Sequence, residues 1–160
     1  MAGIQIIETP EVIAESRVAI IAGRYNQDIV ERLVIGCMET LLQKGLHEES
    51  ISLVRVPGAF ELPLLAKVLA KRNDIDAIIA LGAVIKGDTA HFEYVSGECA
   101  RGLSSVALEC EKPIVFGVLT VDDEQQAWAR AGEGTDNKGV EAANTALEMI
   151  SIMHRVNDDR

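Results

Sequence analysis

Residues 77–84 have the sequence AIIALGAV, a run without a single charged side chain. A strand with no polar face is expected to be buried on both sides, which is typical of the strands of parallel sheets. Runs rich in apolar residues at 18–22, 51–56 and 114–119 predict three further buried strands. The sequence therefore supplies the strands of one parallel sheet.

Amphipathic helices are predicted between these strands. After the first strand, apolar side chains recur every three or four residues and form one helical stripe of Val30, Leu33, Val34, Cys37, Met38 and Leu41. Gly45 follows as a C-terminal stop. Similar stripes follow the second and third strands, a fourth helix is predicted near 123–131, and a fifth follows the loop 132–136. This alternation predicts an α/β fold, a three-layer αβα sandwich around a four-stranded parallel, flavodoxin-like sheet.

The chain of 160 residues has room for one domain, predicted over residues 17–160. Residues 1–16 do not fit the alternation and are predicted to form an N-terminal arm. Within it, Ile4, Ile6 and Ile7 favour a short extra strand. Because the alternation leaves no place for this strand inside the sheet, we expect it to pair with the edge of a neighbouring subunit.

Composition excludes several classes of partner. The net charge is −10, from 15 Lys and Arg against 25 Asp and Glu, which argues against binding to nucleic acid or to an anionic membrane. The longest apolar stretch, 75–85, is interrupted by Asp76 and is too short to span a bilayer. Residues 1–20 lack the pattern of a secretory signal, so we expect a cytoplasmic protein. Three cysteines without a CxxC pair predict neither a disulfide framework nor a metal site.

Candidate site residues follow the predicted strands, because ligands of open parallel sheets bind beyond the carboxyl ends of the strands. The aromatic residues gather near these ends and predict a stacking pocket for a flat ring; they are Tyr25, Phe60, Phe92, Tyr94 and Phe116. Burial in the core is the alternative for Phe60 and Phe116.

The segment after the third strand carries the candidates for anion binding and proton transfer. Residues 87–89 are expected to open a helix, whose free N–H groups bind anions, although Asp88 or Thr89 as a simple helix cap is an equal alternative. A P-loop is excluded because Asp88 stands where that motif has Lys, and no GxGxxG follows the first strand. His91 is a candidate for proton transfer. Arg130 and Lys138 are candidate phosphate ligands or solvated residues at helix ends.

Six ordered segments resemble the lumazine synthase family over nearly the whole chain. They are Arg24-Tyr25-Asn26, residues 56–63 (VPGAFELP), residues 80–95 (ALGAVIKGDTAHFEYV), residues 116–120 (FGVLT), Arg130-Ala131-Gly132 and Asn137-Lys138-Gly139. The resemblance implies condensation of 5-amino-6-(D-ribitylamino)uracil with 3,4-dihydroxy-2-butanone 4-phosphate. The products would be 6,7-dimethyl-8-ribityllumazine, phosphate and water, and neither a metal nor an organic cofactor is implied.

The resemblance also implies a role for each site residue. Those that would bind the pyrimidine and the ribityl chain are Tyr25, Asn26, Ala59, Phe60, Glu61, Ala83, Val84, Ile85 and, from an adjacent subunit, Phe116. Those that would bind the phosphate are Asp88, Thr89, Arg130, acting across the subunit interface, and Lys138. His91 would transfer protons during imine formation and phosphate elimination.

Three departures from the family's usual pattern put affinity in question. Tyr25 stands where Phe or Trp is more frequent, Asp88 places a carboxylate beside the phosphate loop, and residues 133–136 (EGTD) are unusually acidic. The implied partners are small-molecule substrates, further copies of the chain and riboflavin synthase. The copies would form a pentamer and, since no insertion separates the last two helices, a 60-subunit icosahedral shell.

Two other functions fit the predicted fold. One is a non-catalytic flavin-binding module, which the colour of the purified protein would reveal. The other is a response-regulator receiver, which needs an acidic pair after the first strand. The sequence has Arg24-Tyr25-Asn26 at that place, which argues against a receiver.

Overall fold

The computed structural model describes residues 3–8, 11–134 and 136–158. Its parallel sheet has the order β2-β1-β3-β4. The strands are β1 (Val18–Gly23), β2 (Ile51–Val56), β3 (Ala77–Ile85) and β4 (Ile114–Val121). The two central strands, β1 and β3, are the most buried, as their unbroken apolar sequences predict. Residues 51–56 were also predicted to be buried, which is wrong in the single chain: β2 has no fully buried residue and residues 52–54 are exposed, because it lies at the edge of the sheet. The predicted α/β sandwich with four parallel strands is confirmed.

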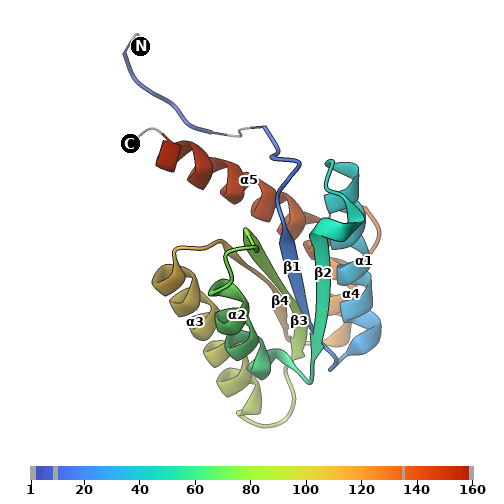
Figure 1. The fold of residues 1–160 in the computed structure, drawn as a ribbon. Helices are drawn as coiled ribbons and strands as arrows, with labels where there is room; N and C mark the ends of the chain where they lie inside the picture. The colour runs from blue at the N-terminus through green and yellow to red at the C-terminus, as the bar shows by residue number, and fades with distance from the viewer. Residues whose placement is uncertain (1–2, 9–10, 135, 159–160) are drawn as a thin grey trace.

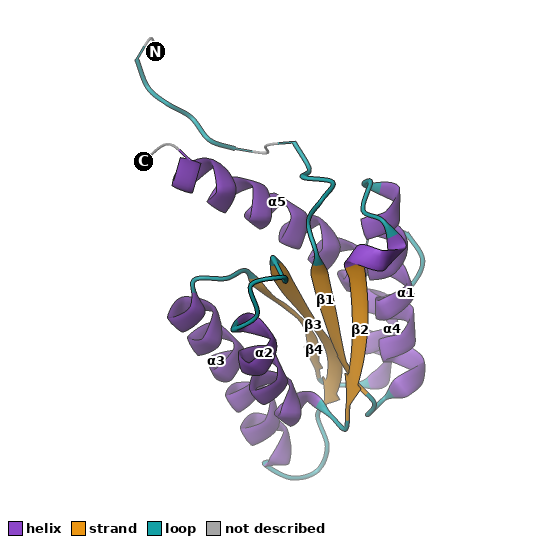
Figure 2. Ribbon diagram, in the orientation of Figure 1, coloured by secondary structure: helices purple, strands orange, loops and turns teal. Residues whose placement is uncertain are grey.

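Helices cover both faces of the sheet (Figures 1 and 2). On one face lie α1 (Gln27–Gln43), α4 (Glu124–Ala131) and α5 (Lys138–Asp158), and on the other α2 (Leu62–Ala70) and α3 (His91–Cys110). Side chains alternate along a strand, so Ile20 packs with α1 and α5 whereas its neighbour Ile21 packs with α2 and α3. Each such buried isoleucine stabilises the fold by about 1.5–3 kcal/mol.

The predicted stripe of α1 is buried at Val30, Leu33, Val34, Cys37 and Leu41, and Met38 packs beside it. Helix α1 is capped by Lys44, and Gly45 follows with a φ of 107°, a left-handed conformation that favours glycine. Two short 3₁₀ turns, η1 (Glu48–Ser50) and η2 (Ala59–Glu61), were not expected from the apolar periodicity.

The segment before β1 has two parts in the structure. Residues 3–8 form no strand within this single chain and run away from the sheet (Figure 1), so the pairing of Ile4–Ile7 with a neighbouring subunit stays a prediction. Closer to β1, Val12 and Ile13 pack on the core, and Ser151 Oγ of α5 donates a 2.7 Å hydrogen bond to the carbonyl oxygen of Glu11.

Residues 1–2 and 9–10 of the predicted arm, and 135 and 159–160 of the predicted domain, lie outside the described residues. Within the described ranges, no helix has both the length and the apolarity needed to cross a membrane.

Candidate functional site

A cavity of about 630 Å³ opens at the carboxyl ends of β1, β2 and β3, beside the first turn of α3. Its volume is in the range of small-molecule sites, and its position is the one expected for an open parallel sheet. The predicted site residues that line it are Tyr25, Asn26, Ala59, Phe60, Glu61, Ala83, Val84, Ile85 and His91. Residues predicted from three separate chain segments therefore meet in one cavity, which we call the ring pocket.

Close backbone contact shapes one wall of the ring pocket. The backbone N–H of Tyr25 donates a 3.1 Å hydrogen bond to the carbonyl oxygen of Pro57. Gly23 and Gly58 approach so closely that a Cβ on Gly23 would lie 3.2 Å from the carbonyl carbon of Gly58. The ring of Tyr25 lies over Gly58 and is 76% exposed, so an aromatic face is available to a ligand at the mouth of the cavity.

Asn26 connects the loop after β1 with the end of β3. Its φ of 56° places it in the left-handed region, which asparagine tolerates better than most residues. Its Nδ2 donates a 2.8 Å hydrogen bond to the carbonyl oxygen of Ala83. This hydrogen bond holds two walls of the ring pocket together.

The turn η2 presents Phe60 and Glu61. One carboxylate oxygen of Glu61, Oε2, accepts a 3.1 Å hydrogen bond from the N–H of Gly58, which fixes the turn. Phe60 is 57% exposed. Because Phe116 is also 45% exposed, the alternative that these two rings belong to the core of the single chain is wrong.

Helix α3 begins at His91, so residues 87–89 form an exposed loop before it rather than its first turn. The N-cap of α3 is Ala90, and no side chain caps the helix, so the alternative that Asp88 or Thr89 is its cap is wrong. Thr89 Oγ1 accepts only a long hydrogen bond of 3.4 Å from the N–H of His91. Neither Asp88 nor Thr89 is among the residues that line the ring pocket. Among the described residues, none forms a hydrogen bond with the imidazole of His91, so both of its nitrogens are available to a ligand.

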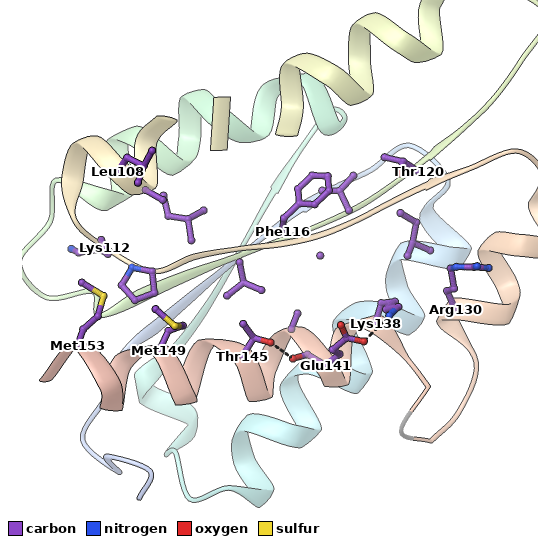
Figure 3. Close-up of a pocket in the computed structure, with 18 of the residues that line it drawn as sticks. Leu108, Lys112, Phe116, Thr120, Arg130, Lys138, Glu141, Thr145, Met149 and Met153 are labelled. Atoms are coloured by element: carbon purple, nitrogen blue, oxygen red, sulfur yellow. Dashed lines mark hydrogen bonds and ion pairs between the residues drawn. The ribbon is translucent and has the colours of Figure 1, made fainter. Parts of the chain in front are cut away.

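Phe116, Arg130 and Lys138 line a different cavity of about 1020 Å³, which runs along the edge strand β4 between α3 and α5. We call it the edge groove. Figure 3 shows Arg130 and Lys138 at one end of it, with Met149 and Met153 at the other. Arg130 Nη1 donates a 2.9 Å hydrogen bond to the carbonyl oxygen of Gln126, and Lys138 Nζ lies 2.6 Å from Glu141 Oε2.

Among the described residues, none lines both the ring pocket and the edge groove. One chain therefore does not bring the predicted cations Arg130 and Lys138 to the cavity that holds Tyr25 and His91. This separation agrees with the expectation that Phe116 and Arg130 act in an adjacent subunit, but a single chain does not test it.

Sequence reasoning gave no role to three of the described residues that line the ring pocket, Pro57, Gly58 and Val95. Tyr94, predicted to belong to a stacking pocket, does line it, whereas Phe116, predicted for the same pocket, lines the edge groove of its own chain. Spacing offered a signal, because Tyr94 and Val95 lie three and four residues after His91 and share its face of α3. Phe92 does not line the cavity.

Two of the three cysteine thiols are fully buried, and the described residues form no evident metal site. No cluster of three or more His, Cys, Asp or Glu suited to a metal occurs in the described part of the chain. Burial raises the pKa of the Cys37 thiol to about 12 and that of Cys99 to about 11, so both stay protonated at neutral pH.

Comparison with protein families gives a match over residues 15–154 to the family described as 6,7-dimethyl-8-ribityllumazine synthase. The chain belongs to the 6,7-dimethyl-8-ribityllumazine synthase family. The resemblance seen in the sequence is thereby confirmed, and the matched range contains every residue of both the ring pocket and the cation pair. Membership in the lumazine synthase family implies a transferase of riboflavin biosynthesis that acts on small molecules and assembles as a homo-oligomer.

Proposed function

We propose that the protein condenses 5-amino-6-(D-ribitylamino)uracil with 3,4-dihydroxy-2-butanone 4-phosphate to give 6,7-dimethyl-8-ribityllumazine, phosphate and water. The observation that carries this proposal is the ring pocket, where Tyr25, Phe60 and His91 meet in a cavity of about 630 Å³ in a chain of this family. An exposed aromatic face can stack on a flat heterocycle, an imidazole can transfer protons to it, and the backbone at the end of a strand can bind its polar substituents.

The pyrimidine ring stacks on Tyr25 and Phe60 in this proposal. The end of β3, residues 83–85, lines the same cavity, and its backbone is suited to polar ring substituents and to the ribityl hydroxyls. Asn26 and Glu61 hold the surrounding loops through their hydrogen bonds to Ala83 and Gly58. The ring subsite is thus built before a substrate arrives.

No enzyme nucleophile is needed for the proposed reaction, because the substrate amine itself attacks the ketone carbon. Water leaves as the imine forms, phosphate leaves afterwards, and the ring then closes with loss of a second water. His91 transfers protons in these steps. Orientation of the two reactants and stabilisation of the departing anion supply most of the rate enhancement.

The phosphate subsite is completed by a second copy of the chain. Arg130 and Lys138 of one copy bind the phosphate held beside the ring pocket of the next, near the loop with Asp88 and Thr89. In the same way Phe116 of the edge groove closes over the ring. A guanidinium suits this role because it binds phosphate through two parallel hydrogen bonds.

We also propose that the copies form a pentamer and that twelve pentamers form an icosahedral shell. Six residues, 132–137, connect the end of α4 with the start of α5, so this connection is short. Sedimentation at several salt concentrations and pH values tests this assembly, and a species no larger than a pentamer under all conditions contradicts the shell. Riboflavin synthase, which would consume the lumazine, stays a predicted partner.

The reaction is tested by mixing purified protein with both substrates and following lumazine fluorescence and phosphate release against a protein-free control. Saturable formation of the two products in equal amounts supports the proposal. If folded and assembled protein gives no rate above the control, the proposed reaction is wrong.

A further inference from the structure

Asn137 lies directly before Lys138, and its side chain is buried, with 4% of the residue exposed. Its Oδ1 accepts hydrogen bonds from the N–H groups of Gly139 at 2.7 Å and Val140 at 3.2 Å, which caps the start of α5. The opposite end of the same amide, Nδ2, donates toward the carbonyl oxygens of Arg32 at 3.2 Å, Ala131 at 3.1 Å and Gly132 at 2.9 Å. One side chain therefore joins α1, the end of α4 and the start of α5.

Two glycines make this position accessible to an asparagine. A Cβ on Gly139 would lie 1.9 Å from the carbonyl oxygen of Leu33, and a Cβ on Gly36 would lie 2.8 Å from Asn137 Oδ1. Helix α1 and the start of α5 thus approach each other as closely as their backbones allow. The site fits a short side chain that has both an acceptor and a donor, and asparagine provides this combination.

The hydrogen bonds of Asn137 lie next to both Arg130 and Lys138, which we call the cation pair. Arg130 immediately precedes Ala131, whose carbonyl oxygen accepts from Asn137, and Lys138 immediately follows Asn137. Figure 3 shows the two cations at the same end of the edge groove. The backbone beneath both cations is therefore held by a single buried amide.

Other contacts of the turn between α4 and α5 are weaker in its described residues. The backbone N–H of Asn137 donates a 3.2 Å hydrogen bond to the carbonyl oxygen of Gly134. In the exposed ion pair of Arg32 and Glu133, Nη1 lies 4.0 Å from Oε1. An exposed ion pair of this kind contributes little. Core packing holds the two helices through buried residues such as Ala131 and Ala143, and the side chain of Asn137 supplies most of the described hydrogen bonds that join the ends carrying Arg130 and Lys138.

We infer that Asn137 is a positioning residue for the phosphate substrate: it sets the relative position of the Arg130 and Lys138 side chains, so that both reach one phosphate. The inference rests on the proposed function, in which these cations bind the phosphate. A substitution of Asn137 is therefore expected to weaken phosphate binding, because it displaces Arg130 and Lys138, and to leave pyrimidine binding in the ring pocket unchanged.

The test compares Asn137→Asp and Asn137→Ser with Ser151→Ala, a matched control. Asn137→Asp keeps the oxygen that accepts from the N–H groups at the start of α5 but replaces the donating amide nitrogen by an oxygen that faces three carbonyl oxygens. Asn137→Ser keeps an accepting oxygen on a shorter side chain and also loses the amide donor. Ser151 is a buried polar residue of α5, and its partner is Glu11, far along the helix from the cations. Its loss affects stability only.

We expect both Asn137 variants to raise the KM for the butanone phosphate and the inhibition constant of inorganic phosphate about 10-fold or more, the loss expected for one misplaced charge-assisted hydrogen bond. The KM for the pyrimidine should change less than about 2-fold, and Ser151→Ala should lower only the melting temperature. Equal increases of both KM values, or a lower melting temperature with unchanged phosphate inhibition, overturn the inference.

Direct titration with inorganic phosphate separates this inference from the proposed reaction. If the wild-type protein does not turn over the substrates but binds phosphate, and Arg130→Ala and Asn137→Ser each weaken that binding, the proposed reaction fails and the positioning role stands. If wild-type protein does not bind phosphate, or if Asn137→Ser binds it as tightly as wild type does, the positioning role is wrong. Should Asn137→Asp fail to fold, Asn137→Ser alone decides.

Discussion

The side-chain Nδ2 of Asn26 donates a 2.8 Å hydrogen bond to the carbonyl oxygen of Ala83, which joins the loop after β1 to the end of β3. The same residue has a φ of 56°. Two properties of one asparagine, its amide and its tolerance of the left-handed region, therefore determine the shape of the ring pocket.

Substitutions separate these two properties. Asn26→Gly keeps the backbone conformation and loses the hydrogen bond, at a cost of about 0.5–1.5 kcal/mol of unfolding free energy. Asn26→Ala also forces an ordinary side chain into the left-handed region, which costs about 1 kcal/mol more. Urea unfolding of both variants measures the difference. Equal stabilities would show that the backbone conformation is not constrained.

Loss of the imidazole of His91 should slow turnover by about 10- to 10⁴-fold, the range of one acid-base group. The KM of each substrate should change little, because stacking and phosphate binding come from other residues. Steady-state kinetics of His91→Ala measures both values. Glu93→Gln is the matched control, since Glu93 is an exposed neighbour on α3 that does not line the ring pocket. Full activity of His91→Ala would refute a role for the imidazole.

Two impaired variants should partly restore each other's activity when they assemble together. His91→Ala damages the ring pocket and Arg130→Ala damages the edge groove, so a site that combines the intact half of each variant is complete. Random mixing of equal amounts restores about a quarter of the sites in a closed symmetric oligomer. The measurement is activity after joint unfolding and reassembly. If activity remains at the level of the separate variants, each site is built within one chain.

Acid should weaken the contact between α2 and α3 through Glu109. Lys67 Nζ lies 2.9 Å from both carboxylate oxygens of Glu109 and holds the pKa of that carboxyl below its ordinary value. A lowered pKa in the folded state adds stability above the unfolded value, about 4.3, and this stability is lost as the pH falls through the folded value. Urea unfolding at pH 6 and at pH 3 should show a smaller pH-dependent loss in Lys67→Met than in wild type. An unchanged loss contradicts the role of this pair.

Thiol reagents should leave Cys37 and Cys99 unmodified in the native protein, because burial raises the pKa values of both thiols to about 12 and about 11. Mass spectrometry after alkylation at pH 8 measures the modification at each site, with unfolded protein as the control. Rapid alkylation of Cys37 in the native state would mean that α1 separates from the core.

The sequence predicted the two central strands well because unbroken apolar runs have few alternatives to a buried parallel sheet. The place of β2 was predicted as well, but its burial was not, since its run includes Ser52 and Arg55 and it lies at the edge of the sheet. Residues of the ring pocket were predicted for a related reason, since the carboxyl ends of adjacent parallel strands necessarily meet. The face of α3 was harder: Phe92 and Tyr94 are two residues apart, and which one faces the cavity depends on how the helix rotates against the sheet. The contacts of Asn137 were not predictable, because their carbonyl partners come from α1 and α4 and meet only in the folded chain.

The separation of the ring pocket from the edge groove has an arithmetical consequence for the proposed assembly. Each chain carries a ring pocket on one side and an edge groove on another, and a complete site needs the ring pocket of one chain and the edge groove of the next. An open row of subunits therefore leaves an unused ring pocket at one end and an unused edge groove at the other. A closed ring leaves neither, and the number of working sites equals the number of chains. Specific activity should therefore fall on dilution before the chains themselves unfold, because opening a ring removes a site without melting a subunit.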